Sequence, residues 1–123
     1  TCRRIKIIKL STIFRTIQQK AITIKFGHII RFDNGSGVML PAISDNDDFH
    51  ELRRNILNGI IANIRRHDPH ITLMHPRNSK CTDEIFESFL NEKLPTQITF
   101  RNISLIEQHN GEQWKTIRKF DLL

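Results

Sequence analysis

The chain of 123 residues carries a formal net charge of +6 and has a sequence pI near 9.8. Its 38% hydrophobic and 26% charged residues are ordinary for a globular domain, which argues against a disordered or fibrous protein. No apolar run approaches the roughly 20 residues that a membrane-spanning helix needs. Length and composition predict one domain over residues 1–123, and the basic surplus favours an anionic partner such as nucleic acid.

The two cysteines, Cys2 and Cys81, form no Cys-x-x-Cys motif, so we expect neither a zinc ribbon nor a redox pair. Their scarcity favours a reducing, cytoplasmic location. The start at Thr1 has neither the apolar segment of a signal peptide nor an initiator methionine. We therefore interpret the sequence as an N-terminally truncated or processed domain. We also expect the protein to be a monomer.

The first third of the chain predicts a helix followed by two strands. Ser11 is a candidate N-cap for a short helix with Phe14 on its apolar face. Alternation around Ile24 predicts a half-buried strand over residues 22–26. A cluster of turn-forming residues at 33–37 then precedes a second strand at residues 38–43.

A longer helix is predicted over residues 45–66. Asp and Asn at positions 45–48 supply caps and the negative charge that favours a helix start. Apolar side chains then recur at helical spacing: Phe49, Leu52, Ile56, Ile60 and Ile64. Arg65 and Arg66 are expected to close the helix, where cations suit its dipole. With Arg53 and Arg54, they are interpreted as a solvated helix face rather than a track for RNA.

The third segment predicts a strand and a helix. Pro69 introduces a strand that begins at His70, and Pro76 ends it. Either Ser79 or Thr82 is then expected to cap a helix.

The last segment predicts strands. Ile98 and Phe100 share a strand face, and the apolar phase shifts by one at Ile103, which indicates a bulge or bend. Asn110–Gly111 predicts a hairpin turn. Trp114 is expected in the core of the strand that follows.

The order of these elements repeats along the chain. The strand at His70 is followed by a helix and a two-stranded hairpin, and the chain start also shows a helix and a hairpin. Aligning Thr82 on Ser11 gives an offset of 71, which places Thr72 on Thr1. The histidine equivalent to His70 is then predicted two residues before Thr1.

The segment His70-Ile71-Thr72-Leu73 contains the candidate catalytic residues. Residues two apart on a strand point to the same face, so His70 and Thr72 are expected to project together, with Ile71 and Leu73 facing a core. An imidazole can take or give a proton near neutral pH, and a hydroxyl can donate to a phosphate oxygen. One such pair is half of an acid–base site, because opening a cyclic phosphodiester needs one group for the attacking water and another for the leaving oxygen.

The residues Pro69–Leu73 resemble the second signature motif of the 2H phosphoesterase superfamily, the 2′-5′ RNA ligase-like proteins. Residues 26–40, 48–66 and 98–122 resemble the central hairpin of that family, the helix before its second motif and its closing hairpin. The resemblance implies a bilobal α+β fold with antiparallel sheets around a central groove and helices outside. The N-terminal part of the first lobe would be missing from this sequence.

The resemblance also implies cyclic phosphodiesterase or RNA 2′-5′ ligase chemistry on RNA or nucleotide 2′,3′-cyclic phosphates, without a metal or another cofactor. His70 would be one of two catalytic histidines, and Thr72 would bind phosphate. Arg77 and Thr1 are candidate substrate-binding residues, and Arg31 is a candidate for the groove wall. Because only one of the two motifs is present, the chain by itself is expected to have little activity.

The other histidines fit the chemistry less well. His28 lacks a hydroxyl residue two positions later and is rejected as the second motif. A metal site built from His67, Asp68, His70 and His75 is disfavoured, because His70 and His75 are an odd number apart and diverge on a continuous strand.

Two functions remain compatible with the sequence: an enzyme acting on RNA ends, and a non-catalytic or truncated module that binds RNA or nucleotides. An upstream His-x-Thr motif would favour the enzyme. A stacking platform for single-stranded RNA is disfavoured, because the chain has no tyrosine and only 7% aromatic residues.

Overall fold

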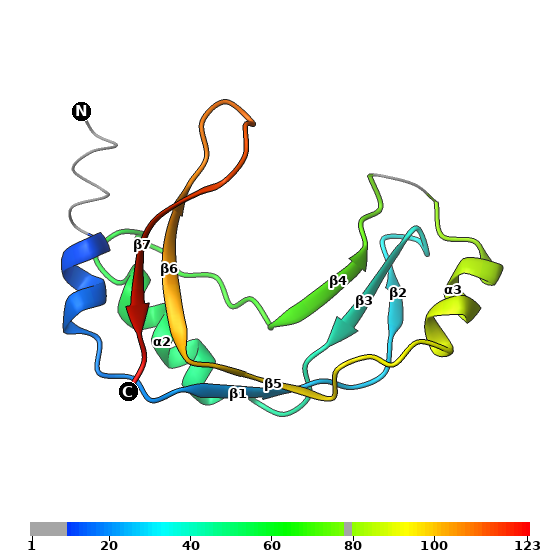
Figure 1. The fold of residues 1–123 in the computed structure, drawn as a ribbon, viewed down its shortest axis with the longest axis horizontal. Helices are drawn as coiled ribbons and strands as arrows, with labels where there is room; N and C mark the ends of the chain where they lie inside the picture. Colours follow the sequence, from blue (N-terminus) through cyan, green and yellow to red (C-terminus); the bar gives the residue numbers. More distant parts are fainter. Residues whose placement is uncertain (1–9, 78–79) are drawn as a thin grey trace. The chain divides into compact units, whose positions relative to one another are not determined.

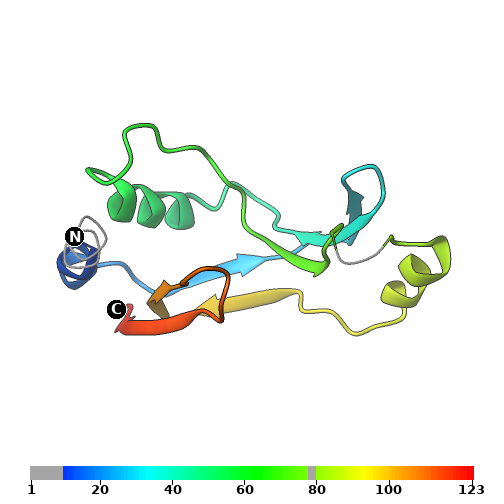
Figure 2. The same cartoon turned by 90° about the horizontal axis from the view of Figure 1, so that it is seen from above.

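The computed structural model describes residues 10–77 and 80–123, and packing divides these residues into two compact units. Unit 1 contains residues 10–22, 47–66 and 99–123, and unit 2 contains residues 23–46 and 67–98. Both units combine helical and strand segments, and the hairpins are antiparallel (Figures 1 and 2). The predicted α+β class is therefore confirmed. None of the helices described is long and apolar enough to cross a bilayer.

Unit 2 is built on an antiparallel sheet of three strands in the order β2-β3-β4 (Figure 1). The strands are β2 (Ile30–Phe32), β3 (Gly37–Pro41) and β4 (His70–Met74). Val38 and Leu40 of the central strand are 0% and 2% exposed, so they form the core of this unit. The predicted turn joins β2 to β3, and the left-handed backbone of Asp33, Asn34 and Gly35 explains its Asp-Asn-Gly sequence.

Helix α3 (Asp83–Leu90) completes unit 2. The Thr82 hydroxyl accepts a hydrogen bond from the backbone N–H of Ile85 at 3.2 Å, so Thr82 is the N-cap. This confirms one of the two predicted caps, and the other, Ser79, lies outside the described residues. Acidic residues in the first turn add favourable interactions with the helix dipole.

Replacing Thr82 with alanine is expected to lower the free energy of unfolding by about 1 kcal/mol, because the first turn of α3 loses its side-chain acceptor. Thr82→Ser keeps the hydroxyl and should stay within about 0.5 kcal/mol of the natural protein. Urea denaturation followed by circular dichroism measures both values. Equal stability of the two variants would show that the cap contributes nothing.

Unit 1 contains helical residues 10–16, helix α2 (Asp47–Leu57) and the hairpin of β6 (Asn102–Glu107) and β7 (Lys115–Asp121) (Figure 1). The ring of Phe14 packs edge-on against Phe120 of β7 with 5.0 Å between ring centroids. Leu52 of α2 and Leu105 of β6 are also buried, at 7% exposure each. The first helical segment and the hairpin therefore pack together through Phe14 and Phe120.

The chain passes between the units along β1 (Ile22–Lys25) and β5 (Gln97–Phe100), which pair with each other. Ile22 and Ile24 are buried and alternate with exposed residues, as the sequence predicts. β5 and β6 are separated only by Arg101, whose carbonyl accepts a hydrogen bond from Leu122 at 2.7 Å. The predicted bend is therefore confirmed, because the two strands belong to different sheets.

The predicted extent of the long helix is wrong. α2 ends at Leu57, nine residues before Arg66. Gly59 has a φ of 83°, which favours glycine, and the N–H groups of Ile60 and Ile61 both bond to the Leu57 carbonyl. The apolar spacing of Ile60 and Ile64 imitated a continuing helix, but Gly59 terminates it.

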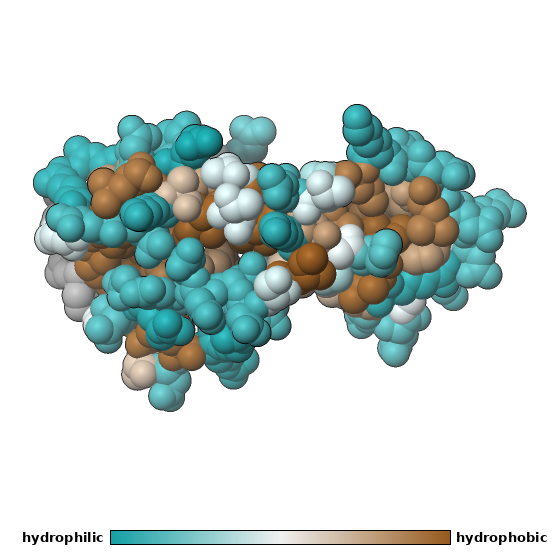
Figure 3. Space-filling model, turned by 90° about the horizontal axis from the view of Figure 1, so that it is seen from below, coloured by the Kyte–Doolittle hydropathy of each residue, from teal (hydrophilic) through white to brown (hydrophobic). Residues whose placement is uncertain are grey.

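Two other local predictions are also wrong. Ser11 lies inside the helical residues 10–16, so it is not their N-cap. Trp114 precedes β7 and is 61% exposed rather than in the core. Asn110 and Gly111 have the positive φ angles expected of the turn, but residues 108–114 form a longer loop between the strands. Figure 3 shows apolar residues at the surface on the face drawn there.

Candidate active site

The candidate catalytic residues lie on β4, which in the described chain pairs only with β3. His70 is opposite Pro41, and Thr72 is opposite Met39. His70 and Thr72 are exposed, whereas Ile71 between them is partly buried. The structure therefore places His70 and Thr72 on one open face of the sheet, as the alternation predicts.

The alternation stops directly after Thr72. Val38 pairs with Met74 and Met39 pairs with Thr72, so the ladder shifts register and Leu73 is an extra residue on β4. Leu73 was expected to share the core face with Ile71, but it lies at this bulge and is only partly buried. A bulge re-aims the strand, so it determines where the chain goes after the motif.

The imidazole of His70 is oriented by the backbone just before the strand. Its Nδ1 lies 3.1 Å from the carbonyl oxygen of Asp68. Because a carbonyl oxygen can only accept, Nδ1 must carry the proton in this contact. The lone pair of the neutral ring is then on Nε2, which can accept a proton and later return it. This orienting carbonyl was not identified from the sequence, although Pro69 restricts Asp68 to extended backbone and so aims that carbonyl.

The spacing of the two side chains suits a phosphate group. Residues two apart on a strand are about 6.6 Å apart along its axis. Hydrogen bonds of about 2.8 Å from Nε2 and from a hydroxyl leave space for one tetrahedral group between them. His70 and Thr72 can therefore contact different oxygens of the same phosphate.

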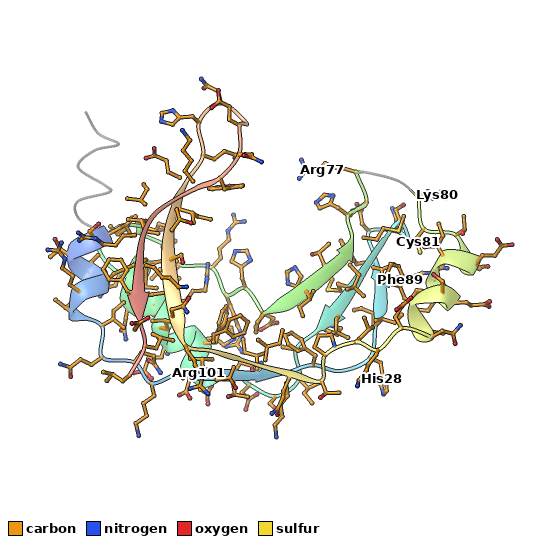
Figure 4. The ribbon with its side chains drawn as sticks, in the orientation of Figure 1. His28, Arg77, Lys80, Cys81, Phe89 and Arg101 are labelled. Atoms are coloured by element: carbon orange, nitrogen blue, oxygen red, sulfur yellow. The ribbon has the colours of Figure 1, made fainter. Side chains whose placement is uncertain are left out.

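Arg77 and Lys80 lie beyond the end of β4, on the way to α3 (Figure 4). Both are exposed. The backbone N–H of Arg77 donates to Nδ1 of His75 at 3.1 Å, which fixes the chain as it leaves the strand. Thr1, the other predicted substrate-binding residue, lies outside the described residues.

Arg31 has a structural position rather than the predicted place in a groove wall. It is opposite Val38, on the face of the sheet that is buried, not on the face of His70. Its guanidinium bonds to Asp83 at 2.7 Å and lies 4.9 Å from the centre of the Phe86 ring. Arg31 therefore connects β2 to α3.

Two of the four candidate metal ligands have a ring nitrogen in a hydrogen bond. Nδ1 of His70 donates to a carbonyl, and Nδ1 of His75 accepts from a backbone N–H. Within residues 10–77 and 80–123, no three His, Cys, Asp or Glu side chains gather as a possible ligand set. His28, rejected as a second motif, is exposed and lies at the end of unit 2 opposite Arg77 (Figure 4).

Comparison with known families agrees with this arrangement of motif and fold. The family model of the 2′-5′ RNA ligase superfamily matches residues 9–112, which include all of unit 2, the whole of β4 and unit 1 up to the loop before β7. The chain therefore belongs to the 2′-5′ RNA ligase superfamily. A comparison with curated proteins gave no significant match.

Proposed function

We propose that His70 and Thr72 are one half-site of a two-histidine phosphodiesterase that acts on RNA or nucleotide 2′,3′-cyclic phosphates. The observation that carries the proposal is the 3.1 Å contact between Nδ1 of His70 and the Asp68 carbonyl, which leaves Nε2 for proton transfer. An oriented imidazole beside a hydroxyl on an open sheet face is suited to bind and protonate a phosphodiester. Membership of the RNA ligase superfamily supports an RNA-like substrate.

The reaction needs two histidines on opposite sides of the phosphorus. One takes a proton from water as its oxygen attacks, and the other gives a proton to the ribose oxygen that leaves. The P–O bond to that oxygen breaks, and the product is a phosphomonoester beside a free hydroxyl. When a ribose hydroxyl of an RNA end takes part instead of water, the same groups catalyse 2′-5′ joining or its reversal. Nε2 of His70 can perform either proton transfer, and Thr72 holds a non-bridging oxygen.

The repeated topology indicates where the partner histidine would be encoded. The hairpin β2–β3 of unit 2 receives β4 on its β3 side, and the hairpin β6–β7 is its counterpart in unit 1. The ends of helical residues 10–16 and of α3, at residues 16 and 90, are 74 positions apart, and the starts of β1 and β5, at residues 22 and 97, are 75 apart. These offsets replace the value of 71 based on Ser11 and move the expected partner to five or six residues before Thr1. Sequencing the coding region upstream tests this, and absence of His-x-Thr or His-x-Ser there would contradict it.

A non-catalytic module for RNA or nucleotide binding is the second candidate. The net charge of +6 supports it, because basic side chains bind phosphates without chemistry. The two candidates differ in one result: with a complete pair of motifs, the enzyme turns over 2′,3′-cyclic nucleotides, whereas the module only binds them.

We also propose a cytoplasmic location. Cys81 is free, buried and 4% exposed. A free thiol fits a reducing compartment, where disulfides are rare.

Replacing Thr72 with valine is expected to lower kcat/KM for a 2′,3′-cyclic nucleotide by about 10- to 100-fold. Valine has the same shape but cannot donate to the phosphate, and a hydrogen bond to a charged group contributes about 1.5–3 kcal/mol. The assay uses the form of the protein that carries both motifs. Thr72→Ser should retain most activity, and Thr116→Val on the exposed side of β7 is the matched control. Full activity of Thr72→Val would remove Thr72 from the site.

A further inference from the structure

Unit 1 contains a cluster of basic side chains that is not part of the proposed two-histidine site. A hollow of about 320 Å³, counting the space at its open mouth, lies between α2 and the segment that follows it. Its lining residues are His50, Arg53, Arg54, Ile64, Arg65 and Arg66. Four of the six lining residues are thus arginines, and none is an aspartate or a glutamate.

The early end of α2 creates this hollow. Arg53 and Arg54 lie in the last turns of the helix, while Arg65 and Arg66 are on the loop that returns along it. Nη1 of Arg53 donates to the carbonyl of Arg65 at 2.5 Å, and this bond holds the loop against the helix. The interpretation of all four arginines as one solvated helix face is therefore wrong.

Compensation of the helix dipole does not account for so much charge. The C-terminal dipole of a helix is equivalent to about half a negative charge. Two carbonyls at this end already accept backbone hydrogen bonds, Arg54 from Asn58 at 2.8 Å and Leu57 from Ile60 and Ile61. The combined charge of the four arginines far exceeds that of the helix end.

We propose that this hollow is a binding site for a phosphate group carried by a nucleotide or an RNA strand. Guanidinium groups bind phosphate oxygens in a bidentate manner, and several around one space select a compact oxyanion over a single carboxylate. Buried His50, 4% exposed, and Ile64 give the site a partly desolvated wall, where such bonds are stronger than in open water. The proposal does not depend on the catalytic role of His70.

The test compares two double variants that lose equal charge. Arg54→Gln with Arg65→Gln removes two guanidinium groups from the hollow and keeps Arg53, which holds the loop. Arg15→Gln with Lys20→Gln removes two exposed cations elsewhere in unit 1. Fluorescence anisotropy with a labelled single-stranded oligoribonucleotide measures affinity at several salt concentrations, and titration with inorganic phosphate followed by NMR of the arginine side chains tests a free anion.

We expect the hollow variant to bind the oligoribonucleotide at least 10-fold more weakly, and the control to change by less than 3-fold. The slope of log K against the logarithm of the salt concentration should become about 1.4 less negative for the hollow variant, because two phosphate contacts on a single strand are lost. Shifts with inorganic phosphate alone would indicate that a free phosphate suffices, and shifts only with the oligoribonucleotide would indicate a strand as the source.

A variant that keeps the charge tests the shape of the guanidinium groups separately from their charge. Arg54→Lys with Arg65→Lys keeps the net charge but loses the planar fork, so several-fold weaker binding is expected. Equal weakening by the hollow and control variants would overturn the proposal in favour of general charge. So would unchanged affinity of the glutamine variant, or no arginine shift with either ligand. These results leave the His70 assignment unaffected, because turnover measures that separately.

Discussion

Replacing His70 with asparagine is expected to lower kcat for a 2′,3′-cyclic nucleotide by about 10²- to 10⁴-fold, the usual contribution of a general acid or base. The asparagine amide can still donate to the Asp68 carbonyl, as Nδ1 of His70 does at 3.1 Å. The variant therefore keeps the local hydrogen bond and loses the group that transfers the proton. KM should change little, because the proposed phosphate contact of Thr72 is retained.

The measurement uses the form that carries both motifs, with the release of a phosphomonoester as the signal. His67→Asn is the matched control, because His67 is an exposed histidine on the loop before β4. It should retain turnover within about 2-fold. Unchanged turnover in His70→Asn would refute the catalytic assignment, whereas equal loss in both variants would indicate a structural effect of this segment.

Replacing Leu40 with alanine is expected to lower the free energy of unfolding by about 2–5 kcal/mol. Leu40 is 2% exposed in the central strand of unit 2, and it pairs with Ile71 beside the two site residues. Truncation leaves a cavity as well as losing burial. Since domains are stable by about 5–15 kcal/mol, this one change removes a large part of the total.

Urea denaturation followed by circular dichroism gives the size of this loss. Leu90→Ala is the matched control, because Leu90 is 62% exposed and should change stability by about 0.5 kcal/mol or less. Leu40→Met keeps the volume and should cost less than about 1.5 kcal/mol. Equal denaturation midpoints for Leu40→Ala and Leu90→Ala would show that β3 is not the core of unit 2.

Local patterns predicted much of unit 2. The alternation at Ile24, the turn at residues 33–37 and the cap at Thr82 each depend on a few neighbouring residues, and each is present in the structure. The strand at His70 begins where Pro69 predicts it. The turn and the cap are readable because their hydrogen bonds close within three or four residues, and the strand is readable because its buried and exposed residues alternate with period two.

Of the two main misses, one came from a local helix stop and the other from an interaction over a distance. Ile60 and Ile64 continue a helical spacing, but the chain turns at Gly59 and returns along α2. Arg31 was a candidate for the groove wall, yet its guanidinium bonds to Asp83, 52 positions later. Spacing alone does not show which residues from other segments a side chain will meet.

For the candidate site, the sequence by itself determined the pair of His70 and Thr72, because strand geometry places residues two apart on one face. It also indicated the superfamily, which the family match confirmed. The structure added a local contact that spacing alone did not identify, with Nδ1 of His70 lying 3.1 Å from the carbonyl of Asp68 two residues earlier. It alone brought Arg65 beside Arg53, because the fold of a loop against a helix depends on packing and on one long-range hydrogen bond rather than on local spacing.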